Sequence, residues 1–107
     1  MVVRRFDVYL VNLDPTVGGE MRKTRPCVVI SPDEMNRHVR TFLIAPLTSS
    51  DRSFPTRVEC EFGGKRGRVV LDQIRVVDRS RLIKKLGAMA DRCRGNVLRG
   101  LAELFAP

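Results

Sequence analysis

Two polar residues, each next to a short apolar run, have side chains of the kind that can bind and activate a phosphate group. Arg25 precedes the apolar run Cys27–Ile30, and Thr48 follows the largely apolar stretch Thr41–Leu47. A guanidinium can bind phosphate oxygens through two hydrogen bonds and stabilise charge that develops on them. A threonine hydroxyl can position a phosphate oxygen or the 2′-hydroxyl of RNA. The pattern therefore points to phosphodiester transfer within RNA, where the substrate's own 2′-hydroxyl is the nucleophile.

Such a reaction also needs a group that accepts the 2′-hydroxyl proton. Arginine stays protonated at any ordinary pH, so a carboxylate, either Glu20 or Asp72, is the better candidate for the base. The alternative role for this carboxylate is to orient Arg25. The residues alone leave a simpler alternative open, in which Arg25 pairs with Glu20 and Thr48 only caps a turn. The candidate catalytic residues are Arg25, Thr48 and Glu20. The candidate RNA-binding or supporting residues are Thr24, Ser49, Asp72, Gln73, Lys23 and Arg22.

These side chains depend on a set of short strands to bring them together. Hydrophobic patterning predicts strands over Phe6–Leu13, Cys27–Ser31, Thr41–Leu47 and Thr56–Phe62, with one or two more within Arg68–Val77, interrupted near Asp72. If the second and third strands pair in antiparallel fashion, Arg25 and Thr48 face the same edge of the sheet. Pro46 predicts an edge position or a bulge for its strand.

The residues between and after the predicted strands indicate loops, turns and helices. Glycine and proline predict a loop over Thr16–Arg25 and a turn over Gly63–Gly67, and Asp33 is a plausible N-cap of a short helical piece within Pro32–Arg40. Ser80 is predicted to cap a helical turn that Gly87 ends. Cys93, Val97, Leu101 and Leu104 recur on one face of a C-terminal helix. The fold class is mainly β with a C-terminal helix, as a small curled antiparallel sheet or barrel.

The charge of the chain indicates the class of binding partner. Twenty lysines and arginines stand against 12 acidic residues, for a net charge of +8, and the basic residues are densest within Lys65–Lys85. Such a field favours a polyanion, most often nucleic acid, although a basic surface can equally be a solvated face. Aromatic platforms on which bases could stack are sparse, because the chain has one tyrosine and five phenylalanines.

Length and composition exclude several other classes of protein. The 107 residues form one domain, 1–107, without a spanning apolar segment or a signal-peptide pattern, so a cytoplasmic protein is expected. The three cysteines are widely spaced and are expected to be buried thiols. With His38 as the single histidine, neither a metal site nor a cofactor is expected.

The same residues carry a family resemblance. The chain resembles the MazF/PemK toxins of type II toxin–antitoxin modules from about Arg5 to Leu104. The matching segments are Asp7–Pro15, Gly18–Glu20, Thr24–Asp33, Ala45–Ser49 and Val70–Arg75, followed by Ser80–Leu82 and Lys85–Gly87. Val70 stands where the PemK branch has an arginine, which favours the MazF branch. Ala90 stands where a serine or threonine usually caps the last helix.

The resemblance implies a small SH3-like (MazF/PemK/CcdB-type) antiparallel barrel that forms a homodimer. It implies a sequence-specific, metal-independent endoribonuclease (mRNA interferase) that cuts single-stranded RNA and leaves 2′,3′-cyclic phosphate and 5′-hydroxyl ends. A cognate MazE-like antitoxin would inhibit it through an acidic, disordered tail. Carried over by position, Arg25 and Thr48 are the catalytic pair, Glu20 lies in a mobile loop over the site, and Asp72, with Gln73 beside it, matches an acidic position used in some branches.

Two other functions remain to be distinguished from the ribonuclease. A toxin of the same fold can act on DNA gyrase by protein contact, but such proteins lack the Thr24–Pro26 and Pro46–Thr48 motifs that are present here. A nucleic-acid-binding module without activity would also fit the charge. The RNA recognition sequence is expected to depend on the segments Thr16–Lys23 and Ser49–Phe54, whose composition does not decode into bases.

Overall fold

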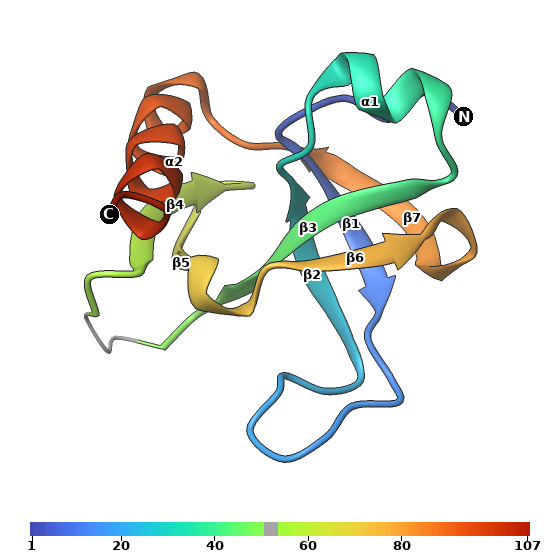
Figure 1. Cartoon of the computed structure of the whole chain (residues 1–107), viewed down its shortest axis with the longest axis horizontal. Helices are drawn as coiled ribbons and strands as arrows, with labels where there is room; N and C mark the ends of the chain where they lie inside the picture. The colour runs from blue at the N-terminus through green and yellow to red at the C-terminus, as the bar shows by residue number, and fades with distance from the viewer. Residues whose placement is uncertain (51–53) are drawn as a thin grey trace.

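The computed structural model describes residues 1–50 and 54–107, which form a strongly curled antiparallel sheet with a helix packed at one end (Figure 1). In chain order the elements are β1 (Asp7–Asn12), β2 (Thr24–Val29), α1 (Asp33–His38), β3 (Thr41–Thr48), β4 (Arg57–Phe62), β5 (Lys65–Val70), the 3₁₀ turn η1 (Leu71–Gln73), β6 (Arg75–Asp78), the 3₁₀ turn η2 (Arg79–Arg81), β7 (Leu82–Ala88) and α2 (Asp91–Leu104). The predicted fold class, mainly β with a C-terminal helix, is confirmed.

Strand β3 is shared between two parts of the sheet. The strand order is β4-β5-β3-β2-β1-β7, and β6 pairs with β3 beside this path. On the side away from β2, residues 41–44 of β3 pair with β6, and Leu47 and Thr48 pair with β5. The predicted edge position of Pro46 is therefore wrong. Proline is tolerated inside the sheet because Pro46 lies between the two pairings, where β3 changes partner and no amide donor is required on that side.

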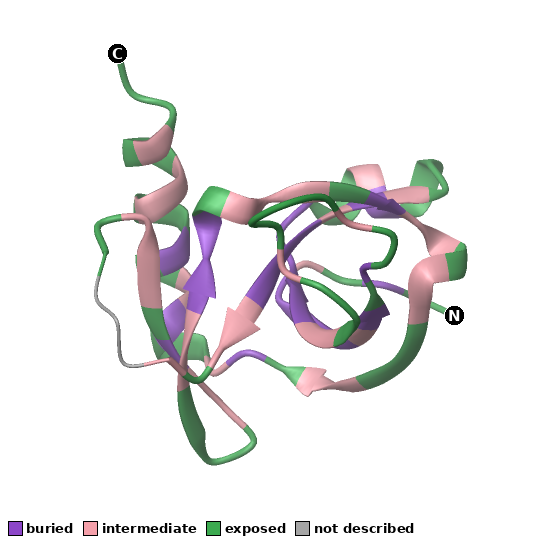
Figure 2. Ribbon diagram, turned by 90° about the horizontal axis from the view of Figure 1, so that it is seen from below, coloured by how far each residue is buried: buried purple, intermediate pink, exposed green. Residues whose placement is uncertain are grey.

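The central strands are buried on both faces, which explains their continuous apolar runs (Figure 2). Alternate residues of β2 enter two different hydrophobic clusters. Val28 packs in the cluster that also contains residues of α2, whereas Cys27 and Val29 pack in a second cluster with Tyr9 and Phe42. A sheet with two buried faces fixes its register strongly, because a shift of one residue would exchange the two clusters.

The segment after η2 is a strand and not the predicted helical turn. Residues Leu82–Ala88 form β7, which pairs antiparallel with β1 with two shifts of register. Ser80 does not cap a helix there; its amide donates to the Asp78 carboxylate at 2.8 Å, within η2. The irregular register obscures the alternation expected of a strand. Pairing with β1 stabilises a strand that the local pattern did not identify.

Two smaller predictions are also corrected at the start of elements. Strand β2 begins at Thr24, before the predicted start at Cys27, so Arg25 lies inside the strand and not at its junction with the loop. Asp33 is the first residue of α1 and not its N-cap, which is Pro32. The Asp33 carboxylate instead accepts the amide of Arg5 at 2.7 Å.

The β4–β5 hairpin is tighter than predicted. Val58, Cys60 and Phe62 face the core side of β4, as the alternation indicated. The turn is limited to Gly63 and Gly64, because Phe62 already pairs with Lys65. Both glycines have positive φ, 59° and 77°, which is the conformation that a two-residue hairpin turn requires.

Helix α2 packs its predicted apolar face against β4 and η1. Cys93 and Val97 are buried, and Leu101 and Leu104 pack at the edge of the same cluster. The helix begins after Ala90 without a side-chain cap, as the sequence indicated. Within the part of the chain that the structure describes, no helix is both long and apolar enough to span a membrane.

The two glycines of α2 are expected to respond in opposite ways to alanine. A Cβ atom at Gly100 would lie 2.7 Å from Leu71 Cδ1 and 2.9 Å from Val58 Cγ2, whereas at Gly95 the nearest neighbour is Arg99 Nη1 at 3.5 Å. Gly95→Ala should raise the free energy of unfolding by up to about 1 kcal/mol through helix propensity. Gly100→Ala should lower it by about 1–2 kcal/mol, because overpacking exceeds that gain. Thermal unfolding of the two variants tests this, and equal stabilisation by both would contradict the close packing of α2.

The stability of the fold should fall above pH 9 because two thiols are buried. Burial raises the pKa of Cys27 from 9.0 to about 12 and that of Cys60 from 9.0 to about 11. Between pH 9 and these values the unfolded chain has released protons that the folded chain retains, so unfolding is favoured as pH rises. Each thiol should lower the free energy of unfolding by about 1 kcal/mol at pH 10 relative to pH 8. Urea unfolding at both pH values measures the loss, and Cys27→Ala should show a smaller pH dependence than the wild type; an equal dependence would contradict the assignment.

Candidate functional site

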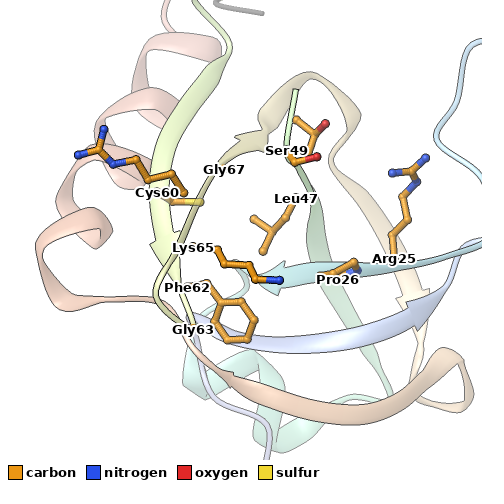
Figure 3. Close-up of a pocket in the computed structure, with 11 residues that line it drawn as sticks. Arg25, Pro26, Leu47, Ser49, Cys60, Phe62, Gly63, Lys65 and Gly67 are labelled. Atoms are coloured by element: carbon orange, nitrogen blue, oxygen red, sulfur yellow. The ribbon is translucent and has the colours of Figure 1, made fainter. Parts of the chain in front are cut away.

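Arg25 and Thr48 meet across the β2–β3 pair. Cys27 of β2 pairs with Pro46 of β3, and continuing this antiparallel register by two residues places Arg25 opposite Thr48. Directly opposed residues of an antiparallel pair present their side chains on the same face. Both residues line one open pocket of about 450 Å³ between β2, β3 and the β4–β5 hairpin (Figure 3). The structure thus brings together the two side chains with which the sequence argument began.

The Arg25 side chain is hydrogen-bonded to the protein through Nε, and its two terminal nitrogens are unengaged by the described residues. Its Nε donates to the backbone carbonyl of Arg22 at 3.1 Å, which fixes the direction of the guanidinium. Among residues 1–50 and 54–107, no hydrogen bond or ion pair engages the two terminal nitrogens of Arg25, so they remain for a ligand. A guanidinium fixed in this way can bind an anion with less loss of side-chain entropy.

Thr48 is the last residue of β3, and it does cap a turn. Its Oγ1 accepts the amide of Ser50 at 3.2 Å. The hydroxyl proton has no acceptor among the described residues and remains available for donation. The alternative in which Thr48 caps a turn and the one in which it contacts a ligand are therefore compatible. Ser49, which is exposed, lines the same pocket.

Glu20 does not pair with Arg25 in this structure. Its Oε1 accepts the amide of Val17 at 2.6 Å, inside the β1–β2 loop. This loop projects from the sheet at the bottom of Figure 1. Glu20 instead lines a smaller pocket of about 170 Å³ together with Asp72 and Gln73. The candidate carboxylates are thus gathered beside the Arg25–Thr48 pocket and not within its lining.

Asp72 and Gln73 both have structural partners. The Asp72 carboxylate accepts the hydroxyl of Thr56 at 3.0 Å and lies 3.7 Å from Arg57 Nε. Gln73 Oε1 accepts the amide of Met21 at 2.7 Å, which ties the β1–β2 loop to η1. Gln73 therefore positions the loop that carries the remaining candidates.

The other loop candidates are exposed on the loop or at the start of β2. Lys23 has a positive φ of 64°, and its amide donates to the Asp14 carboxylate at 3.0 Å. Arg22 contributes the carbonyl that holds Arg25, and Thr24 pairs with Asn12 at the end of β1. Of the second predicted recognition segment, Ser49–Phe54, residues 51–53 lie outside the described part of the chain.

Three of the eight basic residues in the segment Lys65–Lys85 bind backbone carbonyls at and around β1. Arg75 donates to the carbonyl of Leu13, and Arg79 to that of Met1. Arg81 donates to the carbonyls of Asn12 and Asp14. These hydrogen bonds hold β1 and the residues around it, which gives the three guanidiniums a structural role.

Eight of the eleven residues that line the pocket were not singled out by the sequence as site residues, among them two cations and two large apolar residues. Lys65 and Arg66 were counted only as part of the basic segment, and Leu47 and Phe62 only as strand residues. The tight glycine turn after Phe62 could have indicated that Lys65 lies opposite Phe62 in the hairpin and shares its face of the sheet.

Comparison with known proteins gives consistent matches over most of the chain. Residues 4–105 match the model of the family described as PemK-like, MazF-like toxin of type II toxin-antitoxin system. The Endoribonuclease EndoA of Bacillus subtilis (strain 168) is 37% identical over 103 residues, which cover 91% of this chain and 89% of that protein. The Endoribonuclease MazF of Staphylococcus saprophyticus is 36% identical over 97 residues, with 85% and 81% covered. The crystal structure of MazF from Deinococcus radiodurans superposes with a TM-score of 0.84 at 27% identity, covering 97% of this chain and 96% of that chain.

Proposed function

Because this chain belongs to the family of PemK-like, MazF-like toxins of type II toxin–antitoxin systems, we propose that the Arg25–Thr48 pocket is the active site of an endoribonuclease toxin. The observation that carries the assignment is the cross-strand alignment of Arg25 with Thr48 in one open pocket, with the terminal nitrogens of the guanidinium unengaged by described residues. The substrate is single-stranded RNA.

In the proposed reaction the 2′-hydroxyl oxygen forms a bond to the adjacent phosphorus while the bond from phosphorus to the 5′-oxygen breaks. The products are a 2′,3′-cyclic phosphate and a 5′-hydroxyl. Arg25 stabilises the negative charge on the non-bridging oxygens, which is greatest in the transition state. Thr48 donates a hydrogen bond from its hydroxyl to one of these oxygens or to the 2′-oxygen. This hydrogen bond fixes the angle at which the 2′-oxygen approaches the phosphorus.

A carboxylate accepts the proton of the 2′-hydroxyl, and the leaving 5′-oxygen takes up a proton from Arg25. Exchange with water then returns a proton to Arg25 and removes the one on the carboxylate. Glu20 is the proposed base because it lies on the β1–β2 loop, which Gln73 holds beside the pocket. This role requires the loop to move so that Glu20 releases the amide of Val17. Asp72 is the second candidate base. Arg22, Lys23, Thr24 and Ser49 are proposed RNA contacts on the surrounding surface.

The proposal also covers the partners of the protein. The family description supports a cognate MazE-like antitoxin, and the net charge of +8 suits an acidic inhibitory tail. A homodimer and a cytoplasmic location, where mRNA is found, complete the proposal.

The test is cleavage of a long, unstructured RNA by the purified protein, in the presence and absence of EDTA, with mapping of both new ends. Discrete cuts with cyclic phosphate ends, retained in EDTA and lost in Thr48→Ala, are the expected result. An RNA of many sequence contexts that stays whole while it still binds the protein would overturn the catalytic assignment and leave a binding module.

A further inference from the structure

Two of the three cysteines lie where α2 packs against β4 (Figure 1). Cys60 is on β4 and Cys93 is in the first turn of α2, and both belong to the same hydrophobic cluster. The third cysteine, Cys27, is on β2 and belongs to the other cluster. Cys60 and Cys93 are therefore the two thiols that the fold brings to one place.

Contacts at the start of α2 hold these two cysteines next to each other. The amide of Ala90, the residue before α2, donates to the carbonyl of Glu61 on β4 at 3.3 Å, and Arg92 forms an ion pair with the Glu61 carboxylate. Cys60 directly precedes Glu61 in the strand. Cys93 lies one helical turn after Ala90 and donates its amide to the Ala90 carbonyl at 3.0 Å. A disulfide needs Cα atoms within about 7 Å of each other, and this hydrogen-bonded junction suits that requirement.

Both thiols are nearly buried and yet reach a cavity. Cys60 and Cys93 are 6% and 7% exposed. They line an open pocket of about 250 Å³ between β4, β5 and α2, together with polar side chains that include Arg66, Arg92 and Asn96. The pocket has room for a molecule the size of water, whereas the low exposure of the thiols excludes a bulky reagent. Hydrogen peroxide is an oxidant of the size that this pocket admits.

The surroundings of Cys60 make Cys93 the thiol that is oxidised first. Burial, and to a lesser extent the neighbouring Cys93 thiol, raises the pKa of Cys60 from 9.0 to about 11, so Cys60 stays protonated at neutral pH. The thiolate is the reactive form of cysteine, which disfavours a first attack by Cys60. The effect of Cys93 on Cys60 also places the two sulfur atoms near each other, because charge interactions weaken with distance.

We propose that Cys60 and Cys93 are a reversible oxidation site at which a disulfide joins β4 to α2. The Cys93 sulfur attacks one oxygen of hydrogen peroxide, which gives a sulfenic acid and one water molecule. The Cys60 sulfur then attacks the sulfenic sulfur and forms the S–S bond, and the hydroxide that leaves takes up the Cys60 proton as a second water molecule. The thiols lose two electrons and the peroxide gains them. A thiol reductant reverses the bond by exchange.

Cys60 also connects the oxidation site to the Arg25–Thr48 pocket, because it lines both pockets. It pairs with Gly67 of β5, which is so close to β3 that a Cβ atom on it would lie 2.8 Å from the Thr48 carbonyl oxygen. A bond from Cys60 to α2 should shift β4 and β5 and, through them, the backbone of Thr48. The disulfide should therefore lower RNA cleavage. This consequence rests on the proposed function, whereas formation of the disulfide does not.

The experiment treats the reduced protein with hydrogen peroxide, removes the peroxide with catalase and analyses the product without reductant. Peptide mapping by mass spectrometry should find Cys60 linked to Cys93 and Cys27 still a free thiol, because Cys27 is fully buried in the other cluster. In the linked protein, kcat for RNA cleavage should fall at least about 10-fold, because catalysis is sensitive to small displacements of its groups. Dithiothreitol should restore kcat to within about 2-fold of its starting value.

Variants of single cysteines separate the disulfide from other oxidation. Cys93→Ala and Cys93→Ser each remove one thiol of the pair, and Cys93 does not line the Arg25–Thr48 pocket. Both variants should cleave RNA at the wild-type rate and keep that rate after peroxide treatment, and thermal unfolding identifies which of them is folded at the assay temperature. Cys27→Ala is the matched control, because it also removes one buried thiol but should lose activity on oxidation as the wild type does.

Three results would count against the site. Thiols that stay free, or that are oxidised without being linked, would overturn the disulfide. Linked protein with unchanged kcat would overturn its effect on the pocket, as would equal inactivation of Cys93→Ala and the wild type by peroxide. Peptide mapping needs no RNA, so a protein that links its cysteines but never cleaves RNA would contradict the proposed function and would leave the oxidation site supported.

Discussion

Arg25→Ala should lose RNA cleavage by about 10³-fold in kcat while the protein stays folded. The guanidinium is the proposed group that stabilises charge on the phosphate, and removal of one well-placed donor in such sites lowers kcat by about 10²–10³-fold. Among the described residues the Arg25 side chain makes one hydrogen bond, at Nε, so its removal should change the free energy of unfolding by less than about 1 kcal/mol. Single-turnover cleavage at saturating protein measures kcat without the effect on binding.

A second substitution at this position separates the effect of charge from that of geometry, and a substitution on α1 serves as the control. Arg25→Lys keeps the positive charge but loses the planar pair of donors, so it should recover part of the activity and remain at least about 10-fold below the wild type. Arg37→Ala, which removes an exposed arginine of α1, is the matched control and should cleave at the wild-type rate. Cleavage by Arg25→Ala at the control rate would show that another group stabilises the transition state.

Gly67→Ala should impair both stability and activity although it removes no functional group. A Cβ atom at Gly67 would lie 2.8 Å from the backbone carbonyl oxygen of Thr48. A backbone atom cannot rotate away as a side chain can, so β3 and β5 must separate where β3 carries Thr48. The expected loss is about 1–3 kcal/mol in the free energy of unfolding. A displacement of about 1 Å at the proposed catalytic hydroxyl should lower kcat by about 10²-fold.

The measurement is kcat at a temperature well below the unfolding midpoint of the variant, so that unfolded protein does not contribute. Gly95→Ala adds the same methyl group on an exposed part of α2 and should keep full activity. If Gly67→Ala is destabilised but cleaves normally, then the position of Thr48 does not limit the reaction.

The parts of the fold that the sequence predicted well are those with local signals. The run Cys27–Ile30 is a buried strand because both of its faces meet a core, and the four apolar positions of α2 follow the helical repeat. The glycine turn after Phe62 and the interruption of the sheet near Asp72 also have local chemical causes. In each case a few neighbouring residues determine the conformation.

Strand β7 could not be predicted in this way, because its conformation depends on residues far away in the sequence. Leu82 and Leu86 suggest a helical spacing, and only β1, about 75 positions earlier, converts the segment into a strand. Pro46 posed the same difficulty. A proline inside a sheet is acceptable only if the neighbouring strand changes at that residue, and this cannot be inferred from the residues around Pro46.

The candidate site was predicted in part for a similar reason. The alignment of Arg25 with Thr48 follows from the antiparallel pairing of two strands that the sequence did indicate. The sequence could not show which cations face a ligand. Arg81 and Lys65 look alike in a basic segment, but Arg81 is engaged by backbone carbonyls near β1, and Lys65 is open at the pocket. This distinction depends on tertiary contacts.

The pairing of β1 with β7 has a consequence for synthesis of the protein. Strand β1 is paired on both sides only after β7 has been made, so a growing chain on the ribosome cannot complete its sheet until the codons for Leu82–Ala88 have been translated. Chains that stop before β7 leave one side of β1 unpaired, which is an exposed strand edge that can pair with other chains. For a protein proposed to destroy mRNA, this order means that the message has been translated through the codons of β7 before the molecule has a complete sheet.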